Sequence, residues 1–173
     1  SRIWAGSTGG VFIYDMKADK YPEYNILNGL LGIDISAVTC DKSSQNVYIG
    51  TNSGILTICS EDIKLEHFLD IKESKFPNSK INRFFKYGNS LYIAGGFGLA
   101  VFDLEKRVFK ESILRIGEFD RLSNVNDIFI DNDTIWIATS QGVAKANISS
   151  AISNPNSWTT YSTINGLDDK ETI

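Results

Sequence analysis

The sequence predicts an all-β fold made of four copies of one antiparallel sheet, and three observations support this prediction. An aliphatic–aromatic–aliphatic–small motif recurs at intervals of 44 residues, with its aromatic residue at Trp4, Tyr48, Tyr92 and Trp136. Six residues after each aromatic stands a glycine, and an aliphatic residue follows each glycine. Helical periodicity is absent throughout the chain. Short apolar runs bounded by turn residues are typical of β-strands, and a fixed period of this length indicates a repeat architecture.

Each repeat is expected to hold four strands, the second of which carries the aromatic motif. Before three of the motifs lies a first apolar strand, over Ile35–Cys40, Ile81–Tyr87 and Val125–Ile130. After each glycine comes a third strand, over Val11–Tyr14, Ile55–Ile58, Leu99–Phe102 and Val143–Ala146. A weaker fourth strand follows, over Tyr21–Ile26, Ile63–Leu69, Val108–Leu114 and Trp158–Ser162. Gly54, Gly98 and Gly142 are expected to have positive φ in the turn between the second and third strands, because a Cβ atom disfavours that conformation.

Four antiparallel strands in a unit of about 40–50 residues are the signature of a β-propeller blade. We predict blades over residues 35–70, 80–114 and 124–162, a partial blade over 1–27, and the start of another over 163–173. The partial blade begins at its second strand. We therefore expect an excerpt of a ring of six to eight blades, with a closed four-bladed ring as the alternative. Apolar side chains around Ile3, Val11, Ile13, Ile135 and Ile137 would then be partly exposed on the terminal blades.

Composition and charge exclude several classes of protein. The chain is 42% hydrophobic and 22% charged, which is too apolar and too balanced for a disordered chain. No apolar run approaches the roughly 18 residues of a membrane helix, so we expect no membrane insertion. The sequence pI of about 5.0 argues against a nucleic-acid partner, because such a partner requires a basic surface.

The sequence offers little catalytic chemistry. His67 is the single histidine and lies on an outer strand, where solvent exposure is the default interpretation and a metal ligand or general base the alternative. Cys40 and Cys59 end the first and third strands of one blade, about 9–10 Å apart, which is too far for a disulfide. We expect both to be reduced, buried, small hydrophobic residues rather than nucleophiles.

Three further segments have ordinary turn or loop explanations. Asp131-Asn132-Asp133 lacks the glycine and the distal glutamate of a calcium loop and is interpreted as a hairpin turn, while the acidic run 168–171 is interpreted as a solvated loop. Gly95-Gly96-Phe97-Gly98 has no strand-to-helix context for phosphate binding. We therefore expect no metal and no cofactor.

Several stretches resemble known propeller repeats. Asn28-Gly29-Leu30, the run from Val47 to Ile55 and the run from Ile135 to Val143 are similar to two-component-regulator propeller repeats. A narrower resemblance, to the N-terminal propeller of PorZ-type proteins of the type IX secretion system, rests on residues 80–82, 98–104, 115–117, 125–127 and 157–158. The resemblance implies a bacterial extracytoplasmic location, periplasmic or at the cell surface. It implies either a glycan-sensing region of a hybrid sensor kinase or a surface component that handles secreted cargo.

The expected function is non-enzymatic ligand binding or scaffolding. The alternative is a propeller enzyme, a lyase or hydrolase with an axial active site, but the inner-strand ends offer Asn82, Asn126 and Asp127 and no histidine. Long loops on a rigid scaffold are where recognition sits, and here they are the connections between blades. We expect a glycan, lipopolysaccharide or protein ligand on this loop face, and association with further blades or with a second copy through the terminal blades. The candidate ligand-binding residues are Lys75, Phe76, Lys80, Phe97, Arg115, Phe119 and Arg121.

Overall fold

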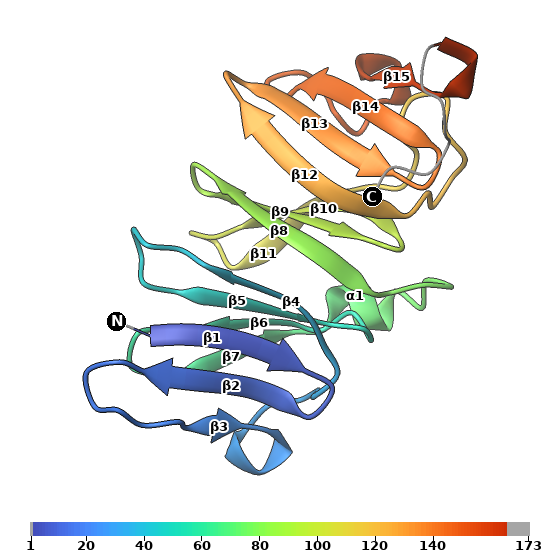
Figure 1. The fold of residues 1–173 in the computed structure, drawn as a ribbon. Helices are drawn as coiled ribbons and strands as arrows, with labels where there is room; N and C mark the ends of the chain where they lie inside the picture. Colours follow the sequence, from blue (N-terminus) through green and yellow to red (C-terminus); the bar gives the residue numbers. More distant parts are fainter. Residues whose placement is uncertain (1, 166–173) are drawn as a thin grey trace. The chain divides into compact units, whose positions relative to one another are not determined.

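The computed structural model describes residues 2–165, and its chain divides into two compact units of two sheets each (Figure 1). Residues 1–81 form unit 1 and residues 82–173 form unit 2. The expected start of another blade over 163–173 falls largely outside the described residues. Among the described residues, no helix combines the length and the apolar character that crossing a membrane would need.

Unit 1 contains a three-stranded and a four-stranded antiparallel sheet. The first sheet has the order β1-β2-β3, with strands β1 (Arg2–Ser7), β2 (Gly10–Asp15) and β3 (Glu23–Tyr24). The second has the order β4-β5-β6-β7, with strands β4 (Ile35–Cys40), β5 (Val47–Thr51), β6 (Leu56–Cys59) and β7 (Leu65–Phe68). A 3-10 helix, η1 (Ile26–Asn28), lies between the sheets in the chain, and the one-turn helix α1 (Asp70–Glu73) follows the second sheet.

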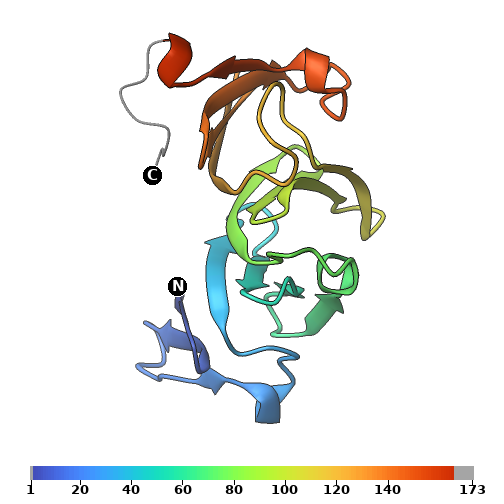
Figure 2. The same ribbon diagram turned by 90° about the vertical axis from the view of Figure 1, so that its right-hand side faces the viewer.

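Unit 2 contains two four-stranded antiparallel sheets, which form adjacent layers in both ribbon views (Figures 1 and 2). The first comprises β8 (Ile81–Tyr87), β9 (Ser90–Gly95), β10 (Gly98–Asp103) and β11 (Val108–Ile113). The second comprises β12 (Val125–Asp131), β13 (Thr134–Thr139), β14 (Gly142–Asn147) and β15 (Thr159–Tyr161). The 3-10 helices η2 (Pro155–Ser157) and η3 (Thr163–Asn165) flank β15. The predicted all-β fold of repeated antiparallel sheets is confirmed.

The glycines that follow the second strands have the expected conformation. The φ values are 82° at Gly54, 106° at Gly98 and 141° at Gly142. At Gly98 a Cβ atom would also lie 2.5 Å from the carbonyl oxygen of Ile113. This position therefore excludes other residues both through its backbone conformation and through the neighbouring strand.

The second sheet departs by one residue from the strict 44-residue repeat. Two-residue turns join the second and third strands of the other sheets, where Ser7 pairs with Gly10 and Thr139 with Gly142. Here Gly50 pairs with Leu56, so the third strand begins at Leu56 rather than at the predicted Ile55. Thr51 accommodates the extra residue, because its hydroxyl oxygen accepts a hydrogen bond of 2.9 Å from the N–H of Ile55.

Each unit has an apolar core between its two sheets. In unit 1, Val11 and Ile13 of β2 pack with Val47 and Ile49 of β5, and Trp4 packs against them from β1. In unit 2 the corresponding core extends over both complete sheets and reaches the loop residues that precede β12 and β15. Its members include Tyr92, Leu99, Val101, Ile116, Phe119, Ile128, Ile135, Ile137, Ile152 and Trp158.

The expectation about exposed side chains on the terminal sheets is correct for Ile3 and wrong for the other four. Ile3 is 56% exposed, whereas Val11, Ile13, Ile135 and Ile137 are buried. The reason is the two-residue period of a strand: these four side chains point to the neighbouring sheet of their own unit. Exposed apolar side chains lie at the alternate positions, at Phe12 in the first sheet and at Phe129 and Trp136 in the last.

Candidate functional site

A groove of about 830 Å³ lies in unit 1, at the end of the sheets where the first strand turns into the second and the third into the fourth. Trp4, which is only half-buried, forms an apolar part of its wall. The wall carries charges of both signs. The lining residues are Arg2, Trp4, Asp15, Lys17, Ala18, Cys40, Asp41, Lys42, Gln45, Asn46, Val47 and Glu61.

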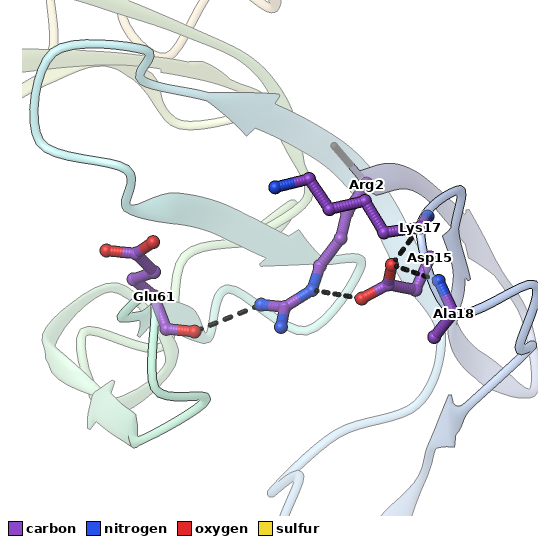
Figure 3. Close-up of polar contacts among 5 residues, drawn as sticks. All are labelled: Arg2, Asp15, Lys17, Ala18 and Glu61. Atoms are coloured by element: carbon purple, nitrogen blue, oxygen red, sulfur yellow. Dashed lines mark hydrogen bonds and ion pairs between the residues drawn. The ribbon is translucent and has the colours of Figure 1, made fainter.

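Arg2 spans the groove between the two sheets of unit 1 (Figure 3). It lies on β1 opposite Asp15 of β2, and its Nε donates to the Asp15 carboxylate at 3.2 Å. Its terminal nitrogen donates to the backbone carbonyl of Glu61 at 3.0 Å, beyond the end of β6. One guanidinium group thus connects the first sheet to a turn of the second and closes one side of the groove.

Asp15 is held by its own turn as well as by Arg2. Its Oδ1 accepts hydrogen bonds from the backbone N–H of Lys17 at 3.0 Å and of Ala18 at 3.2 Å (Figure 3). The N–H of Ala18, followed by the Arg2 guanidinium and the N–H of Lys17, lowers the pKa of Asp15. These partners all stabilise the ionised carboxylate, so Asp15 is suited to structure and charge rather than to general-acid chemistry.

The two cysteines are free, as predicted, but the expectation that both are buried is wrong for Cys40, which is the last residue of β4 and is exposed. Cys40 lines the groove and is exposed, and partial burial of its thiol raises its pKa. Cys59 is fully buried, and burial raises the pKa of its thiol to about 11. The thiolate is the nucleophilic form of cysteine, so raised pKa values argue against covalent chemistry at either residue.

His67 is a structural connector rather than a solvated side chain. Its Nδ1 lies 2.8 Å from the Thr57 hydroxyl and its Nε2 lies 2.9 Å from the carbonyl oxygen of Gly29. Because a carbonyl only accepts, Nε2 donates to Gly29, and in the neutral imidazole Nδ1 then accepts from the Thr57 hydroxyl. The imidazole therefore ties β7 to β6 and to the loop that enters the second sheet.

The predicted inner-strand polar residues are also held by hydrogen bonds in unit 2. Asn82 donates to the Asn124 side chain and to the carbonyl of Val125, both at 2.8 Å. Asp127 forms an exposed ion pair of 3.2 Å with Arg83. Among the described residues, no group of three or more His, Cys, Asp or Glu side chains is placed to hold a metal ion.

The structure divides the predicted ligand-binding residues between the two units. Lys75, Phe76 and Lys80 belong to unit 1, where both lysines are exposed and Phe76 is half-buried. By strand topology they lie at the opposite end of the second sheet from the groove, because they follow its fourth strand. Unit 1 thus has two separate candidate surfaces, of which the groove was not predicted.

The other four predicted residues belong to unit 2, and two of them need correction. Phe97 is 0% exposed and Phe119 is 4% exposed, and Phe119 packs in the core between the two sheets. The side chains of Phe97 and Phe119 are therefore unavailable to a ligand, because their apolar rings are more stable inside than on the loop surface. Arg115 and Arg121 are exposed and remain candidates.

Unit 2 also carries an aromatic cluster on the outer face of its second sheet. The rings of Trp136 and Tyr161 stack with centroids 6.4 Å apart, and the ammonium of Lys145 lies 5.1 Å from the Trp136 centroid. A hollow of about 430 Å³ borders Trp136 and Lys145. The hollow and the groove of unit 1 are alike in that each has a tryptophan and a lysine among its lining residues.

The turn role of Asp15 can be recognised from the repeat, although it was not among the predicted site residues. Asp15, Asp103 and Asn147 occupy the same place in their repeats, at the end of the third strand. Each accepts hydrogen bonds from backbone N–H groups of the turn that follows. Alignment of polar residues, in addition to the aromatic and glycine positions, would have found this group.

Comparison with known proteins agrees with the fold. The family model of the N-terminal β-propeller domain of PorZ, of the type IX secretion system, matches residues 3–159. The solved structure of PorZ, a bacterial surface component of that system from Porphyromonas gingivalis, superposes with a TM-score of 0.79 at 21% identity, over 93% of this chain and 21% of that chain. No curated protein sequence gives a significant match.

Two further similar structures are extracellular domains from B. thetaiotaomicron. That of the hybrid two-component system BT3049 has a TM-score of 0.73 at 24% identity, over 98% of this chain and 23% of that chain. The extracellular domain of the one-component system BT4673 has a TM-score of 0.75 at 16% identity, over 98% of this chain and 22% of that chain. The chain thus spans about a fifth of the length of these structures, and at such identities the likeness concerns the fold. Since the family model covers nearly all the described residues, the chain belongs to the PorZ N-terminal β-propeller family.

Proposed function

We propose that this chain is a non-enzymatic binding module of a bacterial extracytoplasmic propeller protein, and that the groove of unit 1 receives its ligand. The observation that carries the proposal is the composition of the groove wall. A half-buried Trp4 lies beside charged side chains of both signs in a hollow of about 830 Å³. An apolar surface with a few polar groups is the usual composition of a ligand site.

The chemistry of the ionisable side chains supports binding over catalysis. Asp15 is ionised and fully engaged with Arg2 and its own turn. Both ring nitrogens of His67 have partners, and the thiols of Cys40 and Cys59 have raised pKa values. A general base or nucleophile needs a pKa near the working pH and access to substrate, and these groups lack one or both.

The extracytoplasmic location is supported by the family and by the structural relatives. The relatives are described as a surface component and as extracellular domains. A protease-accessibility experiment on intact cells tests the location. We expect externally added protease, after permeabilisation of the outer membrane if needed, to digest the protein while a cytoplasmic marker survives. Protection together with the marker would contradict the location.

Binding and catalysis are separated by titration and mass spectrometry. The 173-residue chain and its Trp4→Phe variant are titrated with purified lipopolysaccharide, soluble surface oligosaccharides and short peptides. The difference between their tryptophan fluorescence changes reports on Trp4, because the chain also contains Trp136 and Trp158. We expect saturable binding of at least one class, weakened in Lys17→Glu or Lys42→Glu on the groove rim, and unchanged ligand masses after long incubation. Cleaved or eliminated products that depend on the chain would contradict the non-enzymatic assignment, and failure of every class to bind would contradict the binding role.

A further inference from the structure

The connection between the two sheets of unit 1 contains an Asn-Gly pair whose asparagine is exposed. Asn28 ends η1, and Gly29 follows it with a φ of 102°. An asparagine before a glycine is especially prone to lose its side-chain ammonia, because glycine is flexible and has no side chain that shields its backbone nitrogen. The surroundings also leave space: outside the adjoining residues, the nearest atom to a Cβ added at Gly29 would be Cδ1 of Leu65, at 3.7 Å. Sequence and exposure therefore both favour deamidation at this pair.

The folded turn holds both reacting groups of this pair with other partners. The N–H of Gly29 donates to the carbonyl of Ile26 at 3.1 Å. The side-chain oxygen of Asn28 accepts from the N–H of Asn25 at 3.3 Å. The side-chain oxygen of Asn25 accepts in turn from the N–H of Leu27 at 2.9 Å. Deamidation needs the Gly29 nitrogen to reach the Cγ atom of Asn28, so the reaction requires these hydrogen bonds to break.

Two contacts with the rest of unit 1 anchor the turn. The carbonyl of Gly29 accepts a hydrogen bond of 2.9 Å from Nε2 of His67 on β7, and Leu30 is buried in the core of the unit. The turn itself has little apolar anchoring, because Ile26 is 62% exposed and Leu27 is 94% exposed. Segments with few buried apolar contacts open more readily than the core of a protein. The hydrogen bond from His67 therefore contributes directly to keeping the turn closed.

We propose that Asn28 is a site of self-modification by deamidation, and that the turn closed by His67 sets the rate of this reaction. When the turn opens, the Gly29 nitrogen gives its proton to solvent and forms a bond to Cγ of Asn28. The bond from Cγ to Nδ2 breaks, and Nδ2 takes up a proton and leaves as ammonia. Water then opens the resulting succinimide ring at either carbonyl, which gives aspartate or isoaspartate at position 28. Water is the co-reactant, and no group is oxidised or reduced.

Isoaspartate is the product that changes the turn. Its main chain runs through the former side-chain carbon, which adds one backbone atom between position 28 and Gly29. The carbonyl of Gly29 and the side chain of Leu30 then lose their register with His67 and with the core. Aspartate, by contrast, keeps the backbone and still offers an oxygen to the N–H of Asn25. Deamidation therefore loosens the entry to the second sheet in the chains that carry isoaspartate, and refolding does not reverse the change.

The test follows the modification in the 173-residue chain by peptide mass spectrometry, with fragmentation that distinguishes aspartate from isoaspartate. The parent chain is incubated in mildly alkaline buffer, both folded and in urea. We expect Asn28 to deamidate at least about tenfold more slowly in the folded chain, because the turn has to open first. His67→Ala should raise the folded rate by about tenfold, since loss of a hydrogen bond makes opening easier, and should leave the rate in urea unchanged.

Three variants separate the effect of the turn from general instability. Ile137→Val removes a methylene group from the core of unit 2, lowers stability by a similar amount and should leave the folded rate unchanged. His67→Gln keeps an N–H donor for the Gly29 carbonyl and should stay within about threefold of the parent rate. Asn28→Gln should show no comparable modification at this position, because glutamine would have to form a larger ring, which forms more slowly.

Each contrary result overturns a stated part of the proposal. Equal rates in the folded chain and in urea, or a folded rate that His67→Ala leaves unchanged, would show that the turn does not control the reaction. An increase with Ile137→Val as large as that with His67→Ala would place the reaction in the globally unfolded chain. Absence of product at Asn28 in urea would remove the site itself. Unchanged amide hydrogen exchange around Gly29 and β7 in the isoaspartate chain would show that the modification does not loosen the entry to the second sheet.

Discussion

Unit 1 and unit 2 are built from the same repeat and differ mainly at one end. In unit 2 both sheets have four strands, and Tyr92 is buried beneath Phe85 and Tyr87 of β8. In unit 1 the first sheet has three strands, and the equivalent Trp4 is half-buried and borders the groove. The equivalent aromatic residue is therefore buried in the core of unit 2 and half-buried at the groove of unit 1.

The units also differ in how the third and fourth strands are joined. In unit 2 Ala100 lies opposite Ser112, and these side chains form no hydrogen bond because alanine has neither a donor nor an acceptor. In the second sheet of unit 1 the same place holds Thr57 opposite His67, with a hydrogen bond between them. At this place a side-chain hydrogen bond joins the third and fourth strands in the second sheet of unit 1 and not in the first sheet of unit 2.

The largest expected effect compares core truncations in the two units. Ile137→Ala should lower the free energy of unfolding by about 3–4 kcal/mol, and Ile13→Ala by about 2–3 kcal/mol. Both side chains are buried, but Ile13 lies opposite Trp4, which can move into the space from the groove side. Urea denaturation followed by fluorescence and circular dichroism measures both values. A larger loss for Ile13→Ala would show that the core of unit 1 is as rigid as that of unit 2.

A smaller effect is expected at the turn glycines of unit 2. Gly98→Ala should destabilise by about 2–3 kcal/mol, because its φ of 106° disfavours alanine and its Cβ would meet the Ile113 carbonyl. Gly88→Ala is the matched control, since its φ is 56° and nothing lies within 4 Å of an added Cβ. We expect Gly88→Ala to lower the free energy of unfolding by about 1 kcal/mol or less. Thermal unfolding measures the stability of both variants. Equal decreases in stability for Gly98→Ala and Gly88→Ala would contradict the steric argument.

The periodic features of the sequence predict most of the fold. The aromatic and glycine positions determine the second strands and the turns after them, because their 44-residue spacing reflects one structural unit repeated. The exception is the shifted β6, where the sequence spacing of Gly54 is preserved while the strand pairing moves by one residue. Such a shift depends on how the turn closes through Thr51, which spacing alone does not reveal.

The candidate site was much less predictable. Sequence reasoning placed ligand contacts on the longest loops, but the aromatic residues Phe97 and Phe119 of those loops are buried. The groove arises instead from short turns near Asp15 and Gln45, whose polar composition is ordinary for turns. The groove brings together residues of β1 and of turns from both sheets of unit 1, and this is a property of three-dimensional packing rather than of local sequence.

The polar link in unit 1 gives a third, smaller prediction. His67→Ala should lower the free energy of unfolding by about 1–2 kcal/mol, because Thr57 and the Gly29 carbonyl both lose a partner. Ser112→Ala, at the equivalent place in unit 2, should change it by less than about 0.5 kcal/mol. Chemical denaturation of the two variants measures the difference. A neutral His67→Ala would mean that water replaces the imidazole without cost.

The smallest expected effect concerns the acid limb of stability, where Asp15 of unit 1 and Asp103 of unit 2 have the same turn role. Hydrogen bonds from the following turn lower the pKa of both carboxyls from 3.8, chiefly those from Ala18 to Asp15 and from Lys106 to Asp103. A pKa that is lower in the folded chain means that the ionised group stabilises folding above about pH 4 and that this contribution is lost as the pH falls through the folded pKa. Both carboxylates are partly exposed to solvent, so the effect on Tm should be small.

Substitution by asparagine separates the turn contribution from the charge contribution. Asparagine still accepts the backbone hydrogen bonds, as Asn147 does in the last sheet, so Asp103→Asn should leave Tm at pH 7 almost unchanged. Asp15→Asn also removes the ion pair with Arg2, and we expect a decrease in Tm of up to about 2 °C at low salt. This decrease should disappear in 1 M salt, and it should shrink as the pH falls through the lowered pKa of the Asp15 carboxyl, where the parent chain loses the charge as well. A decrease that is independent of salt and of acidification would show that Asp15 acts through geometry alone, and that Arg2 would hold the groove in the same way without its charged partner.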